Sequence, residues 1–286
     1  MTQNLALKYS SKVDERFKVS SLTDSIINND YDWDGVSTVK VYSVNTSELK
    51  NYTKTGTQRY GAPEELSDTV QTMTLSQDKC FTFTVDKINE TSQAETKTAG
   101  TALRRELDEI VIPEVDTYRI SKLIEGAKTK TVSQTTKSNA YEQFLTAMES
   151  LSDDKVPLIG RVALVTPSYY KFLKLDDTFI KNSDLGQEIV LNGQVGKIDG
   201  TPVIVVPSSY FTDYVNFVLT HTSALIAPVK LSEYKIHNNP PGISGSLVEG
   251  RIIHDAFVLN NKKCGIYVHK TKENQDEDIV SPTTPN

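Results

Sequence analysis

The segment from Glu95 to Ala127 constrains the fold more than any other part of this chain. Its apolar residues recur at helical spacing, at Leu103, Leu107, Ile110, Val111, Val115, Tyr118, Leu123 and Ile124. Charged residues occupy the other face, at Arg104, Arg105, Glu106, Asp108, Glu109, Glu114, Asp116, Arg119 and Lys122. The pattern predicts one helix over 98–125, roughly 40 Å long, with an apolar stripe and a solvated charged face. Such a helix is long for an ordinary compact domain, so it is expected to act as a spine.

Proline 113 lies in the middle of this helix, where it removes a hydrogen bond and crowds the carbonyl four residues back. A kink or break is therefore expected there. Opposite charges three or four residues apart, such as Arg105 with Glu109 and Arg104 with Asp108, are expected to pair on the charged face.

Composition excludes several classes of protein. The chain has 31 basic and 37 acidic residues, a net charge of −6, which argues against a dedicated nucleic-acid reader. Cys80 and Cys264 match no metal or redox spacing, which indicates free thiols in a reducing cytosol. No apolar run resembles a signal peptide or approaches the ~20 residues of a membrane span, so a soluble, non-exported protein is expected.

The N-terminal third changes character twice. Residues 1–32 contain only scattered apolar side chains and are predicted to form an arm that docks elsewhere. Asp30, Asp32, Asp34 and Gly35 copy the start of an EF-hand loop, but Val41 stands where the loop needs a bidentate glutamate. An acidic turn before a strand is therefore the preferred interpretation, over calcium binding.

In two segments that follow, 36–44 and 80–86, side-chain character alternates from one residue to the next, and both are predicted strands. About 35 mostly polar residues separate them, which is long for a loop in a compact domain. The arrangement suggests a two-stranded finger that stands away from the body and needs another surface to lie on. A mobile surface loop is the alternative.

The C-terminal half alternates between helices and strands. Residues 128–138 are a candidate hinge, and 140–148 a helix with Phe144, Leu145 and Met148 inward. A buried strand is predicted at 161–166, followed by a helix that opens at Pro167. Further expected features are a hairpin turning at Asp199-Gly200, sheet at 214–219 and 224–227, a hairpin of 251–259 with 264–269 turning at Asn260-Asn261, and a disordered acidic tail over 271–286.

No motif of an enzyme or a cofactor site is present in the sequence. The glycines around Gly193 and Gly196 do not match a P-loop, because Lys197 is followed by isoleucine, and they do not match G-x-G-x-x-G. Position 246 is serine, so 242–246 is not a nucleophile elbow. The four histidines have no histidine or cysteine partner at helical spacing, which favours structural or solvated roles over a metal site. The interpretation is therefore a protein without cofactor, metal or catalytic residues.

The sequence resembles the major capsid proteins of tailed bacteriophages, especially a group from phages of Gram-positive hosts. The similarity covers roughly residues 28–270. The segments that carry it are 31–43, Tyr60-Gly61, 77–87, 104–123 and 193–207, in this order and spacing.

The resemblance implies an α+β major-capsid fold with an N-terminal arm, a long extended β-hairpin loop, a peripheral domain with a spine helix, and an axial domain. The implied division is 1–32 arm, 33–92 extended loop, 93–135 peripheral domain, 136–244 axial domain, 245–270 return strands of the peripheral domain, and 271–286 disordered tail.

By the same resemblance, the chain would assemble into hexamers and pentamers of an icosahedral virion capsid that encloses double-stranded DNA without sequence-specific binding. Assembly would take place in the host cytoplasm, with a portal, decoration proteins and a scaffolding protein as possible partners. Since the arm begins near Met1, scaffolding would be separate or already removed. The extended loop would lie across a neighbour's spine helix, which makes Tyr52, Lys54, Arg59, Tyr60, Arg104, Arg105, Asp108 and Glu109 the expected contacts between subunits.

Some relatives cross-link a loop lysine to an asparagine, and Lys50, Asn51 and Lys54 lie in the matching region, but such residues are common in any polar loop. Two alternatives stay open. One is an encapsulin-type nanocompartment on the same fold, and the other is an enzyme whose site forms only in three dimensions.

Overall fold

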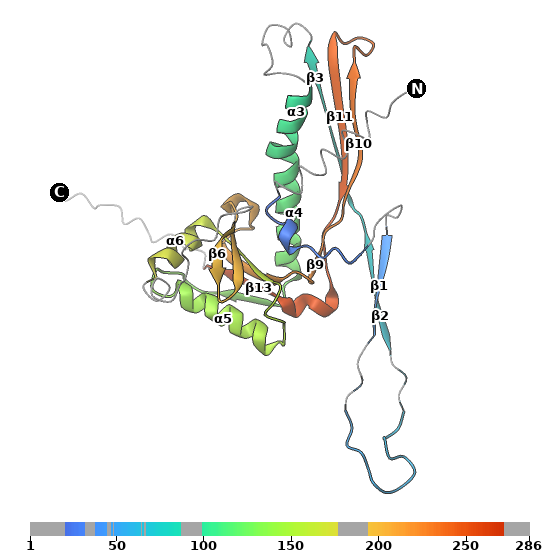
Figure 1. Cartoon of the computed structure of the whole chain (residues 1–286), viewed down its shortest axis with the longest axis vertical. Helices are drawn as coiled ribbons and strands as arrows, with labels where there is room; N and C mark the ends of the chain where they lie inside the picture. The colour runs from blue at the N-terminus through green and yellow to red at the C-terminus, as the bar shows by residue number, and fades with distance from the viewer. Residues whose placement is uncertain are drawn as a thin grey trace, which may run out of the picture.

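The structure is a computed structural model that describes residues 21–31, 38–44, 47, 49–63, 65, 67–86, 99–176 and 194–271. The molecule is elongated (Figure 1). A body built on a six-stranded sheet carries a helical rod toward one end of the long axis and a two-stranded finger toward the other. Most of the acidic tail, the first 20 residues of the arm, and Asp32 and Asp34 of the EF-hand-like segment lie outside the described residues.

The predicted spine helix is one continuous rod with an irregular centre. It consists of α3 (Ala99–Glu106), a π-helical turn (Leu107–Val111) and α4 (Ile112–Gly126). The π turn ends at Val111, two residues before Pro113, and its wider path relieves the clash that a proline ring makes with a regular α-helix. The irregularity expected at the proline is therefore a π turn within an unbroken rod.

The apolar stripe of the rod is mostly confirmed. Leu103, Leu107, Val111 and Val115 are buried against the three-stranded sheet, whereas Leu123 and Ile124 are buried against the body. Three positions were predicted wrongly. Ile110 is 57% exposed although it belongs to the stripe, and Asp116 and Arg119 are 1% and 2% exposed although they were assigned to the solvated face.

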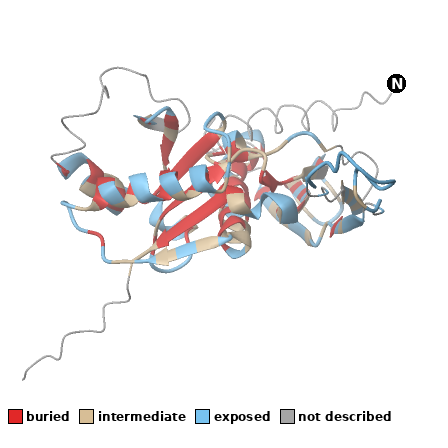
Figure 2. Cartoon of the chain, turned by 90° about the horizontal axis from the view of Figure 1, so that it is seen from below, coloured by how far each residue is buried: buried red, intermediate tan, exposed pale blue. Residues whose placement is uncertain are grey.

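The body is a six-stranded sheet in the order β4-β13-β8-β5-β7-β6, covered on both faces (Figure 2). In β5 (Arg161–Val165), Val162 and Leu164 face the cluster that contains α4. The alternate residues Ala163 and Val165 face α5 (Ala140–Asp153) and α6 (Pro167–Leu175) on the other side of the sheet. Burial on both faces explains why this strand is apolar from Val162 to Val165, after the buried Arg161, and confirms the prediction.

Several local predictions in the body can be compared with the structure. Asp199 and Gly200, with φ of 47° and 79°, turn β6 (Gln194–Ile198) into β7 (Thr201–Val205), as a type I′ hairpin requires. Helix α5 is confirmed, but Leu145 is 38% exposed and does not point inward. The candidate hinge at 128–138 instead contains β4 (Thr129–Val132), which pairs with β13 (Ile266–Lys270).

The predicted C-terminal hairpin is wrong, because its two strands belong to different sheets. Strand β11 (Gly245–His254) lies between β10 (Val229–Asn238) and β3 (Gln77–Asp86) in the three-stranded sheet that packs on the rod. Strand β13 pairs with β8 (Val215–His221) in the body. The chain between them forms β12 (Phe257–Val258), which pairs with β9 (Leu225–Ile226), and a 3₁₀ turn at Asn260–Gly265. A further 3₁₀ turn lies at Ser208–Tyr210.

The finger exists, but its strand pairing differs from the prediction. Strand β1 (Thr38–Val44) pairs with β2 (Asp68–Thr74), a segment within the polar stretch, and not with 80–86. The predicted second strand is part of β3, which leaves the finger and joins the three-stranded sheet. The finger therefore ends in a tip around residues 47–67 that points away from the body (Figure 1).

Candidate assembly surfaces

The finger tip exposes nearly all of its described side chains. Tyr52 and Tyr60 are 52% and 85% exposed, and their rings form an edge-to-face pair with centroids 5.1 Å apart. The amide of Thr53 donates to the carbonyl of Arg59 at 3.0 Å, which holds the two sides of the tip together. Arg59 in turn donates through Nε to the carbonyl of Gly56 at 3.1 Å. The tip is thus an ordered display of aromatic side chains without a core beneath it.

The middle of the tip, residues 49–63, is basic, whereas Glu48, Glu64 and Glu65 flank it. Residues 49–63 contain Lys50, Lys54 and Arg59 and no aspartate or glutamate. All three basic side chains are exposed, as is Leu49. A surface that combines aromatic, aliphatic and cationic groups is typical of a protein contact, because Tyr and Arg are enriched at such contacts.

The root of the finger is fixed to the body. Met73 of β2 is 1% exposed and packs against Ile226 and Leu259. Gln71 accepts from the amide of Asn260 and donates to the carbonyl of Val258, both at 3.0 Å. These contacts give the finger a defined direction, so the exposed tip is carried on a firm base.

Asp255 ties the root to the spine. Its Oδ2 accepts from both the amide and the hydroxyl of Ser76, each at 2.8 Å. Its Oδ1 accepts from the Tyr118 hydroxyl at 2.9 Å and from the amide of Ala256 at 2.7 Å. One buried carboxylate therefore joins the finger, α4 and the end of β11, a role that the sequence analysis missed.

The charged residues predicted for the spine lie on its surface. Arg104, Arg105 and Glu109 are exposed and Asp108 is half-buried. Arg105 pairs with Glu109 at 2.7 Å, as the spacing indicated. These four residues lie in the rod and Tyr52, Lys54, Arg59 and Tyr60 in the tip, so a single chain does not bring the two predicted sets together (Figure 1).

Asp116 and Arg119, the buried charged pair on α4, anchor the N-terminal arm. Residues 21–28, which include the 3₁₀ turn Asp24–Ile26, cross α4; we call them the arm anchor. Asp116 accepts from the hydroxyls of Ser21 and Thr23, at 2.6 and 2.5 Å, and from the amide of Leu22 at 2.9 Å. Beyond the turn, the backbone amide of Asn28 donates to the carbonyl of Leu225 at 2.7 Å.

Arg119 completes this polar contact from the next turn of the helix. Its Nη1 lies 3.7 Å from Asp116 and donates to the Thr23 hydroxyl at 3.0 Å. Burial lowers the pKa of Arg119, and the nearby Asp116 carboxylate opposes that change. Ile26, which is fully buried, adds apolar contact with the body core. We call the set of Asp116, Arg119, Ser21 and Thr23 the polar latch.

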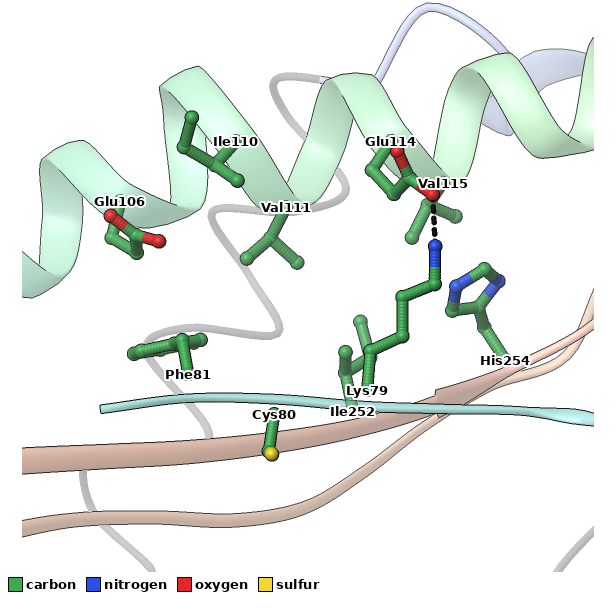
Figure 3. A pocket seen from close by; sticks show the side chains of 10 residues that line it. All are labelled: Lys79, Cys80, Phe81, Glu106, Ile110, Val111, Glu114, Val115, Ile252 and His254. Atoms are coloured by element: carbon green, nitrogen blue, oxygen red, sulfur yellow. Dashed lines mark hydrogen bonds and ion pairs between the residues drawn. The ribbon is translucent and has the colours of Figure 1, made fainter.

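A pocket of about 270 Å³ lies between the spine and the three-stranded sheet (Figure 3). Its walls include Phe81, Val111, Val115 and Ile252, with the exposed Ile110 on the helical side. We call it the spine pocket. Its polar groups are Glu106, the ion pair of Lys79 with Glu114, and His254. The volume suits one or two side chains better than a cofactor, since ligand pockets usually exceed ~300 Å³.

Two histidines are buried in environments that favour the neutral ring. Burial, with Lys79 and Arg119 nearby, lowers the pKa of His254 to about 4. Burial likewise lowers the pKa of His269 to about 4. The ring of His269 lies between Ser133 (Nε2 to Oγ, 2.8 Å) and Asn216, whose amide donates to Nδ1 at 3.3 Å, as a neutral ring requires.

We expect the subunit to lose stability in acid. A histidine with a folded pKa near 4 and an unfolded pKa near 6.5 stabilises the fold fully above pH 6.5, and this contribution is lost as the pH falls toward 4. For each of these two histidines, the free energy of unfolding should fall by about 2 kcal/mol between pH 7 and pH 5. Denaturant unfolding across this range measures the loss. His254→Phe should reduce the pH dependence, and equal slopes in the variant and the wild type would contradict the assignment.

Among the residues that the structure describes, no group of three or more histidine, cysteine or acidic side chains is placed to hold a metal ion. No helix in the described part of the chain is long and apolar enough to cross a membrane.

Comparison with known proteins gives no match to a family model, and no curated protein matches significantly in sequence. Solved structures match over most of their length. A chain of Mycobacterium phage Che8 is 17% identical with a TM-score of 0.65, over 87% of this chain and 90% of that one. The mature capsid of bacteriophage PhiM1 is 11% identical with a TM-score of 0.63, over 84% and 83%.

A virus-like particle from Pyrococcus furiosus is 13% identical with a TM-score of 0.56, over 93% of this chain and 100% of that one. These solved structures come from phages and from a virus-like particle, and each likeness extends over more than four fifths of this chain. The chain therefore has the α+β fold of the tailed-phage major capsid proteins.

Proposed function

We propose that this chain is a major capsid protein, the structural subunit of an icosahedral phage shell that encloses double-stranded DNA. The observation that carries the proposal is the finger. On a fold like that of phage capsids, it projects a firmly rooted tip whose described aromatic and basic side chains are exposed and lie away from the body. Such a feature gains contacts only from another molecule.

The contact between finger and spine would be heterologous, because two different surfaces of the same chain meet. A heterologous contact repeats around a ring when its rotation closes, and hexamers and pentamers are such rings. Tyr52, Lys54, Arg59 and Tyr60 on one copy would face Arg104, Arg105, Asp108 and Glu109 on the next. Many modest contacts repeated over a closed shell strengthen one another, so no single interface needs to be tight.

The proposed role is structural and not catalytic. The shell would lie in the virion after assembly in the host cytoplasm, with a portal, decoration proteins and a separate scaffolding protein as further partners. The DNA would be enclosed without sequence-specific binding, which agrees with a net charge of −6 and the absence of a concentrated basic face in the sequence.

We also propose the division into arm (1–32), extended loop (33–92), peripheral domain (93–135 and 245–270), axial domain (136–244) and tail (271–286). Strand pairing supports two modifications. Strands β4 and β13, which the division places in the peripheral domain, lie in the six-stranded sheet with β8 and β5 and would belong to the axial domain. Strand β10 pairs with β11 along its length, so 229–238 would move with the three-stranded sheet of the peripheral domain.

The test is expression of the full chain followed by sedimentation and electron microscopy of the purified product, alone and with its neighbouring structural genes. We expect closed shells built from rings of five and six subunits, with nuclease-protected double-stranded DNA when the packaging genes are present. Shells that bind a cargo protein and exclude DNA would favour the nanocompartment. Monodisperse monomers at high concentration under both conditions would contradict a shell role.

A further inference from the structure

We propose that the spine pocket is the seat for the aromatic pair Tyr52 and Tyr60 from the finger of a second copy of this chain. The inference rests on the proposed shell function and adds the particular cavity and side chains through which two subunits would join.

The pocket has the properties of a site that lacks its occupant within the monomer. His254 is 1% exposed and lines the pocket, yet neither of its ring nitrogens has a hydrogen-bond partner among the described residues. Buried polar groups are nearly always paired, so an unpaired imidazole beside a cavity indicates a missing donor or acceptor. Ile110 is 57% exposed at the same pocket, in a helix that buries its other aliphatic side chains.

A tyrosine side chain fits both features. Its ring would cover the apolar surface of Ile110, Val111 and Phe81. Both ring nitrogens of His254 are enclosed in the free subunit, so the hydroxyl would donate to one of them after the imidazole turns toward the pocket. Burial keeps the His254 ring neutral near pH 7, so that at least one nitrogen is an acceptor. The pocket volume of about 270 Å³ is of side-chain size. Two exposed tyrosines in contact with each other on a firm finger are the matching group within this chain.

Charge favours the same occupant. Glu106 and Glu114 line the pocket together with Lys79. The adjoining helical surface carries Asp108 and Glu109 beside the exposed Arg104 and Arg105. The finger tip carries Lys50, Lys54 and Arg59 and no acid within 49–63. Lys79 bonds Glu114 at this pocket, but both side chains are nearly half exposed, and such surface pairs contribute little and rearrange readily. The basic, aromatic stretch 49–63 of the tip would therefore face Glu106 and Glu114 in a partly apolar pocket.

The finger of the same chain does not reach this pocket. The pocket lies along β3 and the spine, on one side of the finger root, and the tip extends from the root in the opposite direction (Figures 1 and 3). Because Met73, Gln71 and Ser76 fix the root to the body, the tip cannot fold back without breaking those contacts. The occupant must come from another copy, which makes the contact directional and able to build a ring.

Photo-crosslinking identifies the occupant directly. Tyr60 is replaced by p-benzoylphenylalanine in the full chain, and light- and heavy-isotope preparations are mixed before assembly, irradiated and digested for mass spectrometry. We expect mixed-isotope crosslinks from position 60 to peptides that contain 77–81, 106–115 or 252–254. Crosslinks confined to other regions, crosslinks within one chain, or no crosslink in assembled shells would overturn the proposal.

A substitution series separates this inference from the shell function itself. Ile110→Asp changes an exposed side chain, so the subunit should keep its circular dichroism and melting temperature and lose at least nine tenths of its shell yield. Val132→Asp is the matched control, since Val132 is 54% exposed in β4, away from the pocket, and should assemble. If the wild type forms shells and Ile110→Asp assembles normally, the proposed binding of Tyr52 and Tyr60 in the spine pocket is wrong, whereas the proposed shell function is unaffected. A wild type that forms no shells would instead overturn the function.

Discussion

A subunit that lacks the finger tip should fold normally and form no shells. In this variant, residues 45–67 are replaced by Asn-Gly, which joins Val44 to Asp68 as a two-residue hairpin at the observed strand register. The described residues of the tip contribute almost no buried surface, so the free energy of unfolding should change by less than about 1 kcal/mol. The removed segment contains every finger residue proposed to contact a neighbour, so sedimentation should show only unassembled subunits.

The design depends on where the finger is rooted. A deletion that extended to Gln71 would remove its two hydrogen bonds to Val258 and Asn260 and part of β2, and would mix a loss of anchoring with a loss of contact. A second variant keeps the full finger and replaces Tyr52, Lys54, Arg59 and Tyr60 by alanine; it should fail to assemble in the same way. Shells from either variant, or unfolding of the first, would contradict the assigned role of the tip.

Periodicity predicted the parts of the fold in which one element has one buried face. The spine helix was found because Leu103, Leu107, Val111 and Val115 recur on one side and pack on one sheet. The exception on this stripe, Ile110, is informative: it obeys the helical period yet lies open at the pocket. Local pattern rules are most often broken at functional positions, and here the break helped to locate a proposed contact.

Strand partners could not be predicted in the same way. Strand β2 has the sequence DTVQTMT, in which only Met73 is buried, so no apolar alternation marks it. The threonines favour extended structure, but they also made the stretch look like a polar loop. The C-terminal hairpin was wrong for a related reason. The Asn260-Asn261 dipeptide indicates a turn, but the strands on either side pair with 229–238 and 215–221, over contacts that no local signal encodes.

Asp116 and Arg119 were misassigned because charged side chains are almost always exposed unless they are paired. Their pairing partners, Ser21 and Thr23, lie more than 90 residues earlier in the chain. One signal was present in the sequence. Ile112, Val115, Ile120, Leu123 and Ile124 surround the two charges, and a helix that is apolar on most sides is usually buried. An opposite-charge pair within such a helix indicates a buried pair that another segment must satisfy.

Asp116→Ala should be the most destabilising single substitution proposed for this subunit. It removes the acceptor for Ser21, Leu22 and Thr23 and leaves the Arg119 guanidinium buried beside no carboxylate of the latch. Removal of one partner of a buried ion pair typically costs about 3–5 kcal/mol. Denaturant unfolding measures the loss, with Asp153→Ala as the control, because Asp153 is an exposed acid near the end of α5 and should change stability by less than about 0.5 kcal/mol.

The polar latch predicts where and how this loss occurs. Amide exchange should accelerate over 21–28, where Leu22 donates to Asp116 and Asn28 to Leu225, before it changes in the body strand β5. Because the two charges act as one unit, Asp116→Leu combined with Arg119→Met should cost less than the two single substitutions added together. Additive effects would mean that the two charges do not act as one unit. Unchanged exchange in the arm anchor would mean that Asp116 does not hold the arm. A loss of arm order with an intact body would establish instead that the spine holds the N-terminal arm through this one carboxylate.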